Sequence, residues 1–336
     1  MVTANKALLA EAGLPLFELA HKRQRILRYE ASVAGAIPIV QTLKESLASN
    51  KIKALLGILN GTSNYILSEM TAKNLDFATA LKAAQDLGFA EADPSLDIDG
   101  FDAAHKLCLL IRLAFGVQYP FNAIQVQGIR DLQALDIRLA SELGYHIKLI
   151  GQVQEINEPT PSLTAGVFPT LVPLDCLLAR VEGSFNAIQL HANAAGTLFF
   201  HGRGAGDLPT ASSVLADLMA VARKETPNNT GYFQDLLPKA TILPQGAATS
   251  CYYVRLMVQD CPGILRDIAG CMAEEGISMR QVIQRVDAMP VKAPSHVPLV
   301  LMTHETSEQA MQKALEHIQA LKLPHEPIVT LRVFNS

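Results

Sequence analysis

The sequence lacks the features that mark several classes of protein. It has no block of basic residues, and its formal net charge is −4, so neither a nucleic acid nor an anionic membrane surface is supported as a partner. Its longest apolar segments, such as LCLLIRLAFGV at 107–117, are too short and too interrupted to span a bilayer. No charged leader followed by an apolar core and a cleavage site opens the sequence. We therefore expect neither a membrane protein nor a secreted one.

Cysteine is scarce and scattered. The chain has five cysteines, an odd number, and none of them forms a CxxC pair. This pattern predicts free thiols in a reducing cytoplasm, without a disulfide framework and without a zinc site.

The 336 residues, of which 49% are apolar, are enough for two or three domains with cores of their own. Residues 225–248 contain three prolines and two glycines and show little periodicity, which predicts a linker. In residues 249–336, strand and helix patterns follow one another in the order βαββαβ. This order is that of a ferredoxin-like domain.

Negative charge is concentrated in GFAEADPSLDIDGFDAAHKL at 88–107, where five carboxylates lie between Glu91 and Asp102 and Lys106 follows. If a helix extends from about Gly100 to Phe115, Asp102 and Lys106 are four residues apart and share one face. Such spacing is typical of an ordinary surface ion pair. The apolar residues after Lys106 instead predict a helix that is buried on all sides. In that setting Lys106 is a candidate for proton transfer, because burial lowers the pKa of a lysine from about 10.4.

Glu91 and Asp93, on the loop before this helix, are placed to meet the ammonium group of a substrate. A divalent cation is the competing ligand, since carboxylates suit calcium and magnesium. The spacing does not match an EF-hand loop, and a carboxylate cage for a metal usually lacks an adjacent lysine.

The segment NGTSNYIL at 60–67 predicts a turn from a strand into a helix, with Thr62 or Ser63 as the N-cap. Because free amides at a helix N-terminus bind anions, Gly61 and Thr62 are also candidates to hold the carboxylate of a substrate. GRGAG at 202–206 is not a GxGxxG motif and is a weak phosphate-binding signal by itself.

Four segments resemble homoserine dehydrogenase, in the order VTANKALLA at 2–10, NGTSNYIL at 60–67, the segment 88–107, and GRGAGDLPTASSV at 202–214. The βαββαβ unit, with DCPGIL at 260–265, resembles the ACT regulatory domain of many bacterial members of that family. The resemblance implies interconversion of L-aspartate 4-semialdehyde and L-homoserine with NAD or NADP. This reaction belongs to threonine, methionine and isoleucine biosynthesis.

The resemblance also implies a role for individual residues. The proton donor and its charge-balancing partner match Lys106 and Asp102. Residues expected to contact the substrate are Glu91, Asp97, Gly61 and Thr62. Residues expected near the cofactor are Lys6 and Gly206. A monovalent-cation site, of the kind that takes sodium and is built largely from main-chain carbonyls, matches Glu30, Val33, Gly35 and Ile37.

The implied fold is α/β and α+β. Residues 1–32, with a returning helix at 208–224, are the remnant of a Rossmann domain; 33–207 form an α+β substrate-binding and dimerisation domain; and 249–336 form the ACT domain. The family's GxGxxG turn is absent, so we expect about a hundred residues to be missing before Met1 and the chain alone to bind cofactor weakly. An inactive amino-acid-binding regulatory protein is therefore the alternative function.

Phe89 stands where many relatives have tyrosine, so a hydroxyl contact to the substrate is expected to be lost. The resemblance further implies a homodimer or homotetramer, with threonine as the leading effector. The sequence does not indicate whether NADH or NADPH is preferred, because the residue that sets this preference in a Rossmann domain is not present.

Overall fold

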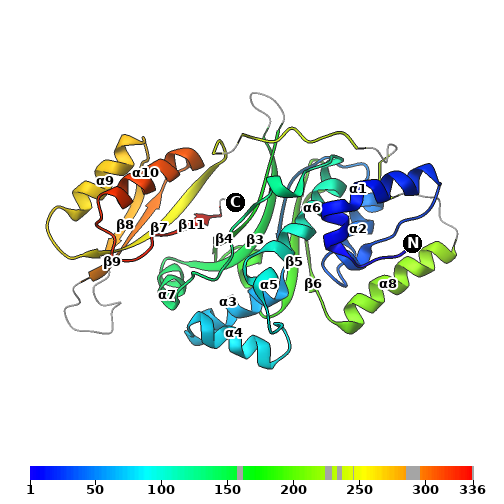
Figure 1. Cartoon of the computed structure of the whole chain (residues 1–336), viewed down its shortest axis with the longest axis horizontal. Coiled ribbons are helices and arrows are strands. Elements are labelled where there is room, and N and C mark those ends of the chain that lie inside the picture. Colours follow the sequence, from blue (N-terminus) through cyan, green and yellow to red (C-terminus); the bar gives the residue numbers. More distant parts are fainter. Residues whose placement is uncertain (157–161, 224–228, 233–236, 245, 285–295, 335–336) are drawn as a thin grey trace.

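The computed structural model describes residues 1–156, 162–223, 229–232, 237–244, 246–284 and 296–334. The described strands form one continuous mixed sheet in the order β6-β5-β1-β3-β4-β11-β7-β9-β8, with β2 paired to β4 and β10 paired to β7 (Figure 1). These strands are β1 (Ile52–Ile58), β2 (Gln125–Val126), β3 (Tyr145–Ile156), β4 (Ser162–Pro173), β5 (Phe185–Ala192), β6 (Gly196–Arg203), β7 (Thr249–Gln259), β8 (Met279–Gln284), β9 (His296–Thr303), β10 (Thr306–Ser307) and β11 (Val329–Val333).

Helices pack on the sheet and beyond its β6 end (Figure 1). They are α1 (Lys6–Lys22), α2 (Ile39–Gln41), α3 (Gly61–Lys73), α4 (Phe77–Asp86), α5 (Ser95–Ile98), α6 (Phe101–Phe115), α7 (Ala134–Glu142), α8 (Asp207–Ala222), α9 (Ile264–Glu274) and α10 (Glu308–Ala320). Within the described ranges, none of these helices is long and apolar enough to cross a membrane.

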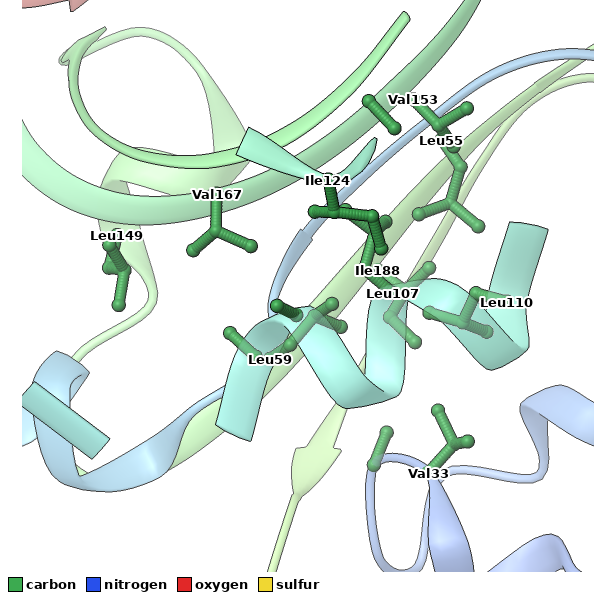
Figure 2. Close-up of a cluster of buried hydrophobic side chains, with 14 of the residues drawn as sticks. Val33, Leu55, Leu59, Leu107, Leu110, Ile124, Leu149, Val153, Val167 and Ile188 are labelled. Atoms are coloured by element: carbon green, nitrogen blue, oxygen red, sulfur yellow. The ribbon is translucent and has the colours of Figure 1, made fainter. Parts of the chain in front are cut away.

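The core of the central part lies between α6 and strands β1, β3, β4 and β5. Figure 2 shows Leu107 and Leu110 of α6 among apolar side chains of these strands, including Leu55, Val153 and Ile188. Because α6 is apolar on nearly every side, each of its residues from 102 to 114 is buried, as the sequence predicted. The few charged side chains of α6 are therefore held inside the protein.

Gly100 fixes the start of α6. Its φ of +90° belongs to the left-handed region, which glycine enters without a steric penalty. A Cβ at this position would lie 3.0 Å from Cγ1 of Val126, so glycine also allows the helix start to approach β2. The predicted helix from about Gly100 to Phe115 is confirmed.

The C-terminal unit has the element order that the sequence predicted for residues 249–336. Strands β11, β7, β9 and β8 lie side by side in that order, all antiparallel, and α9 and α10 pack on the same sheet (Figure 1). This is the strand order of a ferredoxin-like domain.

The C-terminal unit is joined to the central part through strand β11. Arg332 and Val333 of β11 pair in parallel with Thr170 and Leu171 of β4, while β11 pairs with β7 on its other side. The sheet therefore runs through both parts without a break, which the sequence did not predict.

The described parts of the predicted linker 225–248 are packed against the rest of the chain. The side-chain oxygen of buried Asn229 accepts the N–H of Leu27 at 2.8 Å. Further along, the N–H of Leu163 donates to Thr241, and that of Leu243 donates to Leu163.

The two segments assigned by sequence to one domain are in contact. The N–H of Glu30 donates to Oδ2 of Asp217 on α8 at 2.9 Å. Residues 1–32 otherwise form α1, which is kinked at Ala12, a parallel bridge between Val2 and Arg28, and a short 3-10 turn. Their assignment to a Rossmann domain stays a prediction.

Candidate active site

Lys106 and Asp102 form a buried ion pair one turn apart on α6. Nζ of Lys106 donates to Oδ2 of Asp102 at 2.7 Å, and each side chain is only 10% exposed. The same ammonium donates to the main-chain oxygen of Leu59, also at 2.7 Å. The prediction that Asp102 and Lys106 share one face of the helix is thus confirmed. Their burial excludes an ordinary solvated ion pair on the surface.

Lys6 adds a second positive charge to Asp102. Its Nζ lies 3.2 Å from Oδ1 of Asp102, on the carboxylate oxygen that Lys106 does not use. Lys6 is the first residue of α1, whose N-cap Asn5 accepts the N–H of Leu8. The sequence placed Lys6 near the cofactor but did not predict its contact with Asp102.

Asn60 is a site residue that the sequence reasoning missed. Its Nδ2 donates to Oδ1 of Asp97 at 2.7 Å and to Oδ2 of Asp102 at 2.8 Å. Its Oδ1 accepts the N–H of Ser63, so Asn60 is the N-cap of α3. The prediction of Thr62 or Ser63 as N-cap was wrong, because both residues already lie inside the helix. Asparagine directly before GTSN was the available signal, since asparagine is a strong N-cap residue.

The pKa values of the two carboxyl groups in this cluster are shifted in opposite directions. Burial by itself raises the pKa of Asp102, but the ammonium groups of Lys106 and Lys6 outweigh it and lower the pKa to about 2. Burial raises the pKa of Asp97, partly opposed by the hydrogen bond from Asn60. Asp102 therefore keeps a negative charge beside Lys106 at neutral pH.

The lowered pKa of Asp102 gives a testable pH dependence of stability. An Asp with a depressed pKa in the folded state stabilises the fold above its unfolded pKa, near 3.9, and this stabilisation is lost as the pH falls through about 2. We expect Asp102→Asn to reduce the free energy of unfolding by roughly 2 kcal/mol more at pH 5 than at pH 2. Urea unfolding of both proteins across this range measures the difference, and a difference that does not change with pH contradicts the assignment.

Asn186 was also missed. This fully buried residue of β5 donates from Nδ2 to the main-chain oxygen of Leu59, the same atom that accepts from Lys106. A Cβ at Gly204 would lie 2.0 Å from Cγ of Asn186, so the GRGAG segment passes directly over this amide. Asn186 therefore links the segment at 202–206 to the acceptor that positions Lys106.

The predicted substrate contacts lie on two neighbouring segments. Gly61 and Thr62 are the first two residues of α3, where main-chain N–H groups have no partner inside the helix. Oγ1 of Thr62 donates to the main-chain oxygen of Phe89 at 2.7 Å, which ties α3 to the acidic loop. Glu91 follows on that loop with an exposed side chain. No hydrogen bond or ion pair in the described chain joins the Glu91 carboxylate to the Asp102 cluster.

Lys6 and Gly206 meet part of what a dinucleotide cofactor needs. Gly206 has a φ of +114° at the start of α8, and its backbone lacks a side chain that would block a close approach. The sequence contains no GxGxxG turn, the element that binds the pyrophosphate in a Rossmann domain. Lys6 lies beside Asp102, and the contact of Lys6 and Gly206 with a dinucleotide stays a prediction.

The four residues matched to a monovalent-cation site lie in one tight turn with left-handed backbone at Ala34 and Gly35. The Glu30 carboxylate already accepts the N–H groups of Val40 and Gln41 at 2.8 Å each, and burial raises its pKa to about 7. The main-chain oxygen of Gly35 accepts from Oγ of Ser213. Within the described residues no cluster of three His, Cys, Asp or Glu side chains is suited to a metal. An ion here would therefore depend on the second lone pairs of main-chain carbonyls, which is the kind of site that the resemblance implies.

All five cysteines lie in the described ranges as free thiols, as predicted.

Comparison with known proteins gives one consistent family. The family model for homoserine dehydrogenase matches residues 38–219. The homoserine dehydrogenases of Neisseria gonorrhoeae and Pseudomonas aeruginosa are 44% and 40% identical over 99% of this chain. The chain covers 76% and 77% of those two relatives.

Solved structures agree. The crystal structure of a homoserine dehydrogenase from Thiobacillus denitrificans matches 99% of this chain and 76% of its own, with a TM-score of 0.91 and 40% identity. A hyperthermophilic archaeal homoserine dehydrogenase in complex with NADPH matches 68% of this chain and 65% of its own, with a TM-score of 0.58 and 29% identity.

Proposed function

Because this chain belongs to the homoserine dehydrogenase family, we propose that it interconverts L-aspartate 4-semialdehyde and L-homoserine with NAD or NADP. The observation that carries the proposal is the buried Asp102–Lys106 pair at the head of α6. The alternative of an inactive amino-acid-binding protein is not favoured, since dehydrogenases match the chain over nearly its whole length. An assay that follows cofactor absorbance with homoserine at saturating NADP or NAD tests the proposal. High cofactor concentrations are needed, because we expect this chain to bind the cofactor weakly.

In this proposal Lys106 is the proton donor to the substrate oxygen. An ammonium has three N–H donors, and two of those on Lys106 go to Asp102 and Leu59, which leaves one for the substrate. The bound nicotinamide supplies the hydride. As the carbonyl oxygen becomes an alkoxide, Lys106 gives it a proton, and in the reverse direction Lys106 takes the hydroxyl proton. Asp102 acts as the positioning residue, because it holds the ammonium at 2.7 Å from one oxygen.

The proposed substrate contacts follow from charge. Homoserine carries an ammonium and a carboxylate, so the Glu91 and Asp97 carboxylates suit the former and the N–H groups of Gly61 and Thr62 suit the latter. Asp97 is fixed in place by Asn60, which also touches Asp102. Asn60 therefore sets the spacing between the substrate pocket and the proton donor.

Glu91→Gln tests the ammonium contact. The substitution keeps the shape of the side chain and removes its charge, so we expect KM for homoserine to rise roughly ten- to a hundredfold while KM for cofactor changes little. Asp86→Asn is a matched control, because Asp86 is an exposed carboxylate that pairs with Lys82 on α4. Equal effects of Glu91→Gln on both KM values argue against an amino-group site.

Lys6 and Gly206 are the proposed cofactor contacts, and Glu30, Val33, Gly35 and Ile37 are the proposed sodium site. The loop that contains the proposed sodium site contacts the segment that leads to Gly206, since the N–H of Ala36 donates to the main-chain oxygen of Arg203 at 3.1 Å. This contact supports a joint role of the two segments in binding the cofactor. An ion at 33–37 would thus stabilise the backbone that leads to Gly206.

The C-terminal unit is proposed to be an ACT domain that binds threonine. Gly263 precedes α9 with a φ of +102°, and the N–H groups of the helix start suit the carboxylate of an amino acid. ACT domains commonly bind ligands between paired copies, so this proposal includes a homodimer or homotetramer. Feedback by threonine fits the biosynthesis of threonine, methionine and isoleucine.

We expect threonine at a hundred times its Kd to stabilise the folded chain by about 2.7 kcal/mol. Gly263→Val should remove this response, because the new side chain blocks the approach to the backbone. The control is Gly270→Val inside α9, where an added Cβ has nothing within 4 Å. Thermal shifts with threonine, methionine, isoleucine and valine measure the effect, and an intact threonine response in Gly263→Val places the site elsewhere.

A further inference from the structure

Each of the two acceptors of the Lys106 ammonium is shared with an asparagine. Oδ2 of Asp102 accepts from Lys106 and also from Nδ2 of Asn60. The main-chain oxygen of Leu59 accepts from Lys106 at 2.7 Å and from Nδ2 of Asn186 at 3.0 Å. Because a carbonyl oxygen has two lone pairs, these two donors use the full acceptor capacity of Leu59. Asn186 therefore confines the ammonium to one lone pair of that oxygen.

The two asparagines are anchored in different ways. Oδ1 of Asn60 accepts the N–H of Ser63, so hydrogen bonds fix both ends of the Asn60 amide. Asn186 is fully buried, yet its Oδ1 has no hydrogen-bond partner in the described part of the chain. Native proteins keep few such unpaired buried acceptors, because each of them destabilises the fold. The Asn186 amide is thus held by a hydrogen bond at its Nδ2 end alone.

Packing against Gly204 holds the other end of the Asn186 amide. A Cβ at Gly204 would lie 2.0 Å from Cγ, 2.1 Å from Nδ2 and 2.3 Å from Oδ1 of Asn186, so the main chain of the segment at 202–206 covers the amide. The φ of Gly204 lies outside the left-handed region, so the Asn186 amide, and not the backbone conformation, excludes a side chain here. The position of Asn186 therefore follows the position of this segment.

The segment at 202–206 is itself in contact with the turn at 33–37. A Cβ at Gly35 would lie 2.6 Å from the main-chain carbon of Gly204, and the N–H of Ala36 donates to the main-chain oxygen of Arg203. A continuous series of contacts thus leads from this turn through Gly204 and Asn186 to the acceptor of Lys106.

We propose that Asn186 is a positioning residue for proton transfer, which makes the direction of the Lys106 ammonium depend on the segment that leads to Gly206. With the segment in place, Asn186 occupies one lone pair of Leu59, and the third N–H of Lys106 stays directed at the substrate oxygen. When the segment moves, the amide moves with it, and the ammonium is free to turn toward the vacated lone pair. This role rests on the proposed function, in which Lys106 is the proton donor.

Asn186→Leu tests the role with little change in the shape of the side chain. Leucine branches at Cγ as asparagine does, but it has no N–H to donate and no unpaired acceptor, so the melting temperature should stay the same or rise. We expect kcat for homoserine oxidation to fall roughly ten- to a hundredfold, because a small misplacement of a catalytic group has an effect of this size. KM for homoserine should change less than about threefold. An unchanged kcat, or a change confined to KM, overturns the proposal.

Asn229→Leu is the matched control. Asn229 is also a fully buried asparagine, but its amide bonds to the main chain of Leu27 and Arg25, away from Lys106. We expect a lower melting temperature, because the N–H of Leu27 loses its acceptor, and a kcat within about threefold of the unsubstituted chain. A loss of kcat equal to that in Asn186→Leu would assign both losses to loosened packing and would reject the positioning role.

Gly204→Ala tests the dependence on the segment. The added methyl group must displace the Asn186 amide, so kcat should fall about as far as in Asn186→Leu. In the double variant Asn186→Ala/Gly204→Ala the displaced atoms are absent, and we expect the same kcat as in Asn186→Ala alone. If the two losses instead multiply in the double variant, the segment acts on catalysis by another route and the proposed dependence is wrong.

NMR of the chain labelled with ¹⁵N at its lysines distinguishes a failure of this role from a failure of the proposed function, since it needs neither substrate nor cofactor. The ammonium signal of Lys106 is identified by its absence in Lys106→Met. We expect Asn186→Leu to shift this signal, because the Leu59 oxygen loses its second donor. An unchanged signal overturns the positioning role. A shifted signal in a chain without dehydrogenase activity supports the positioning of the ammonium and contradicts the proposed function instead.

Discussion

Lys106→Met is expected to lower kcat for homoserine oxidation by about 10²–10⁴. Methionine keeps the length and the apolar stem of lysine but has no proton to give or take. The loss should appear in kcat at saturating homoserine, because the proposed ammonium and carboxylate contacts do not involve Lys106. The variant and the unsubstituted chain are compared at one cofactor concentration, so that weak cofactor binding affects both alike. A loss of less than tenfold is too small for a proton donor and would remove Lys106 from that role.

A second variant separates catalysis from stability. Lys106→Met leaves Asp102 buried with only Lys6 as an ionic partner, which costs stability by itself. In the double variant Asp102→Asn/Lys106→Met the uncompensated charge is gone, so the melting temperature should recover while kcat stays low. Recovery of kcat together with stability would show that Lys106 acts only on the fold.

Arg255→Met is expected to reduce the free energy of unfolding by about 3–5 kcal/mol. Arg255 on β7 is fully buried, and its Nε lies 2.5 Å from Oδ1 of Asp136 on α7, whose side chain is also fully buried. Its Nη2 donates to the other oxygen of Asp136 at 3.1 Å and to Oε1 of Gln133 at 2.9 Å. Removal of the guanidinium leaves the Asp136 charge buried without its partner, at the contact between the C-terminal unit and the central part.

The double variant Asp136→Asn/Arg255→Met is the control, since it removes both charges and should recover a large part of the lost stability. Urea unfolding followed by circular dichroism gives the free energies. Arg138→Met is a second control: it makes the same substitution at another arginine, on helix α7 beside Asp136. A loss below about 1 kcal/mol in Arg255→Met would mean that the pair behaves like a surface salt bridge.

The sequence predicted the parts of this molecule that depend on local spacing. Helix α6, its burial and the contact between Asp102 and Lys106 follow from a period of 3.6 residues and from an apolar run. The βαββαβ order of the C-terminal unit follows in the same way from alternation and turn residues.

The rest of the site depends on contacts between distant residues. Asn60 touches Asp102 across 42 residues, and Asn186 touches Leu59 across 127. A single asparagine in a turn or strand has no periodic pattern, so its role appears only when the fold brings its partner close. The resemblance to a family named the proposed substrate and cofactor residues, but it did not reveal these two amides, which hold the cluster together.

The continuity of the sheet could not be predicted from the sequence for the same reason. Two residue pairs join β11 to β4, and the partners Arg332 and Thr170 are far apart in sequence. The sequence pattern therefore did not predict the pairing of β11 with β4.

The position of β11 has a consequence for how the protein is made in the cell. Ribosomes add about 5–20 residues per second, so β4 waits roughly 10–30 seconds after its synthesis before β11 exists to pair with it. The edge of β4 at Thr170 exposes unpaired main-chain groups throughout that time, and the edge of β7 does so from the synthesis of β7 onward. Such edges are templates for association with other chains. The nascent chain thus has two unpaired strand edges until a single five-residue strand, β11, pairs with both.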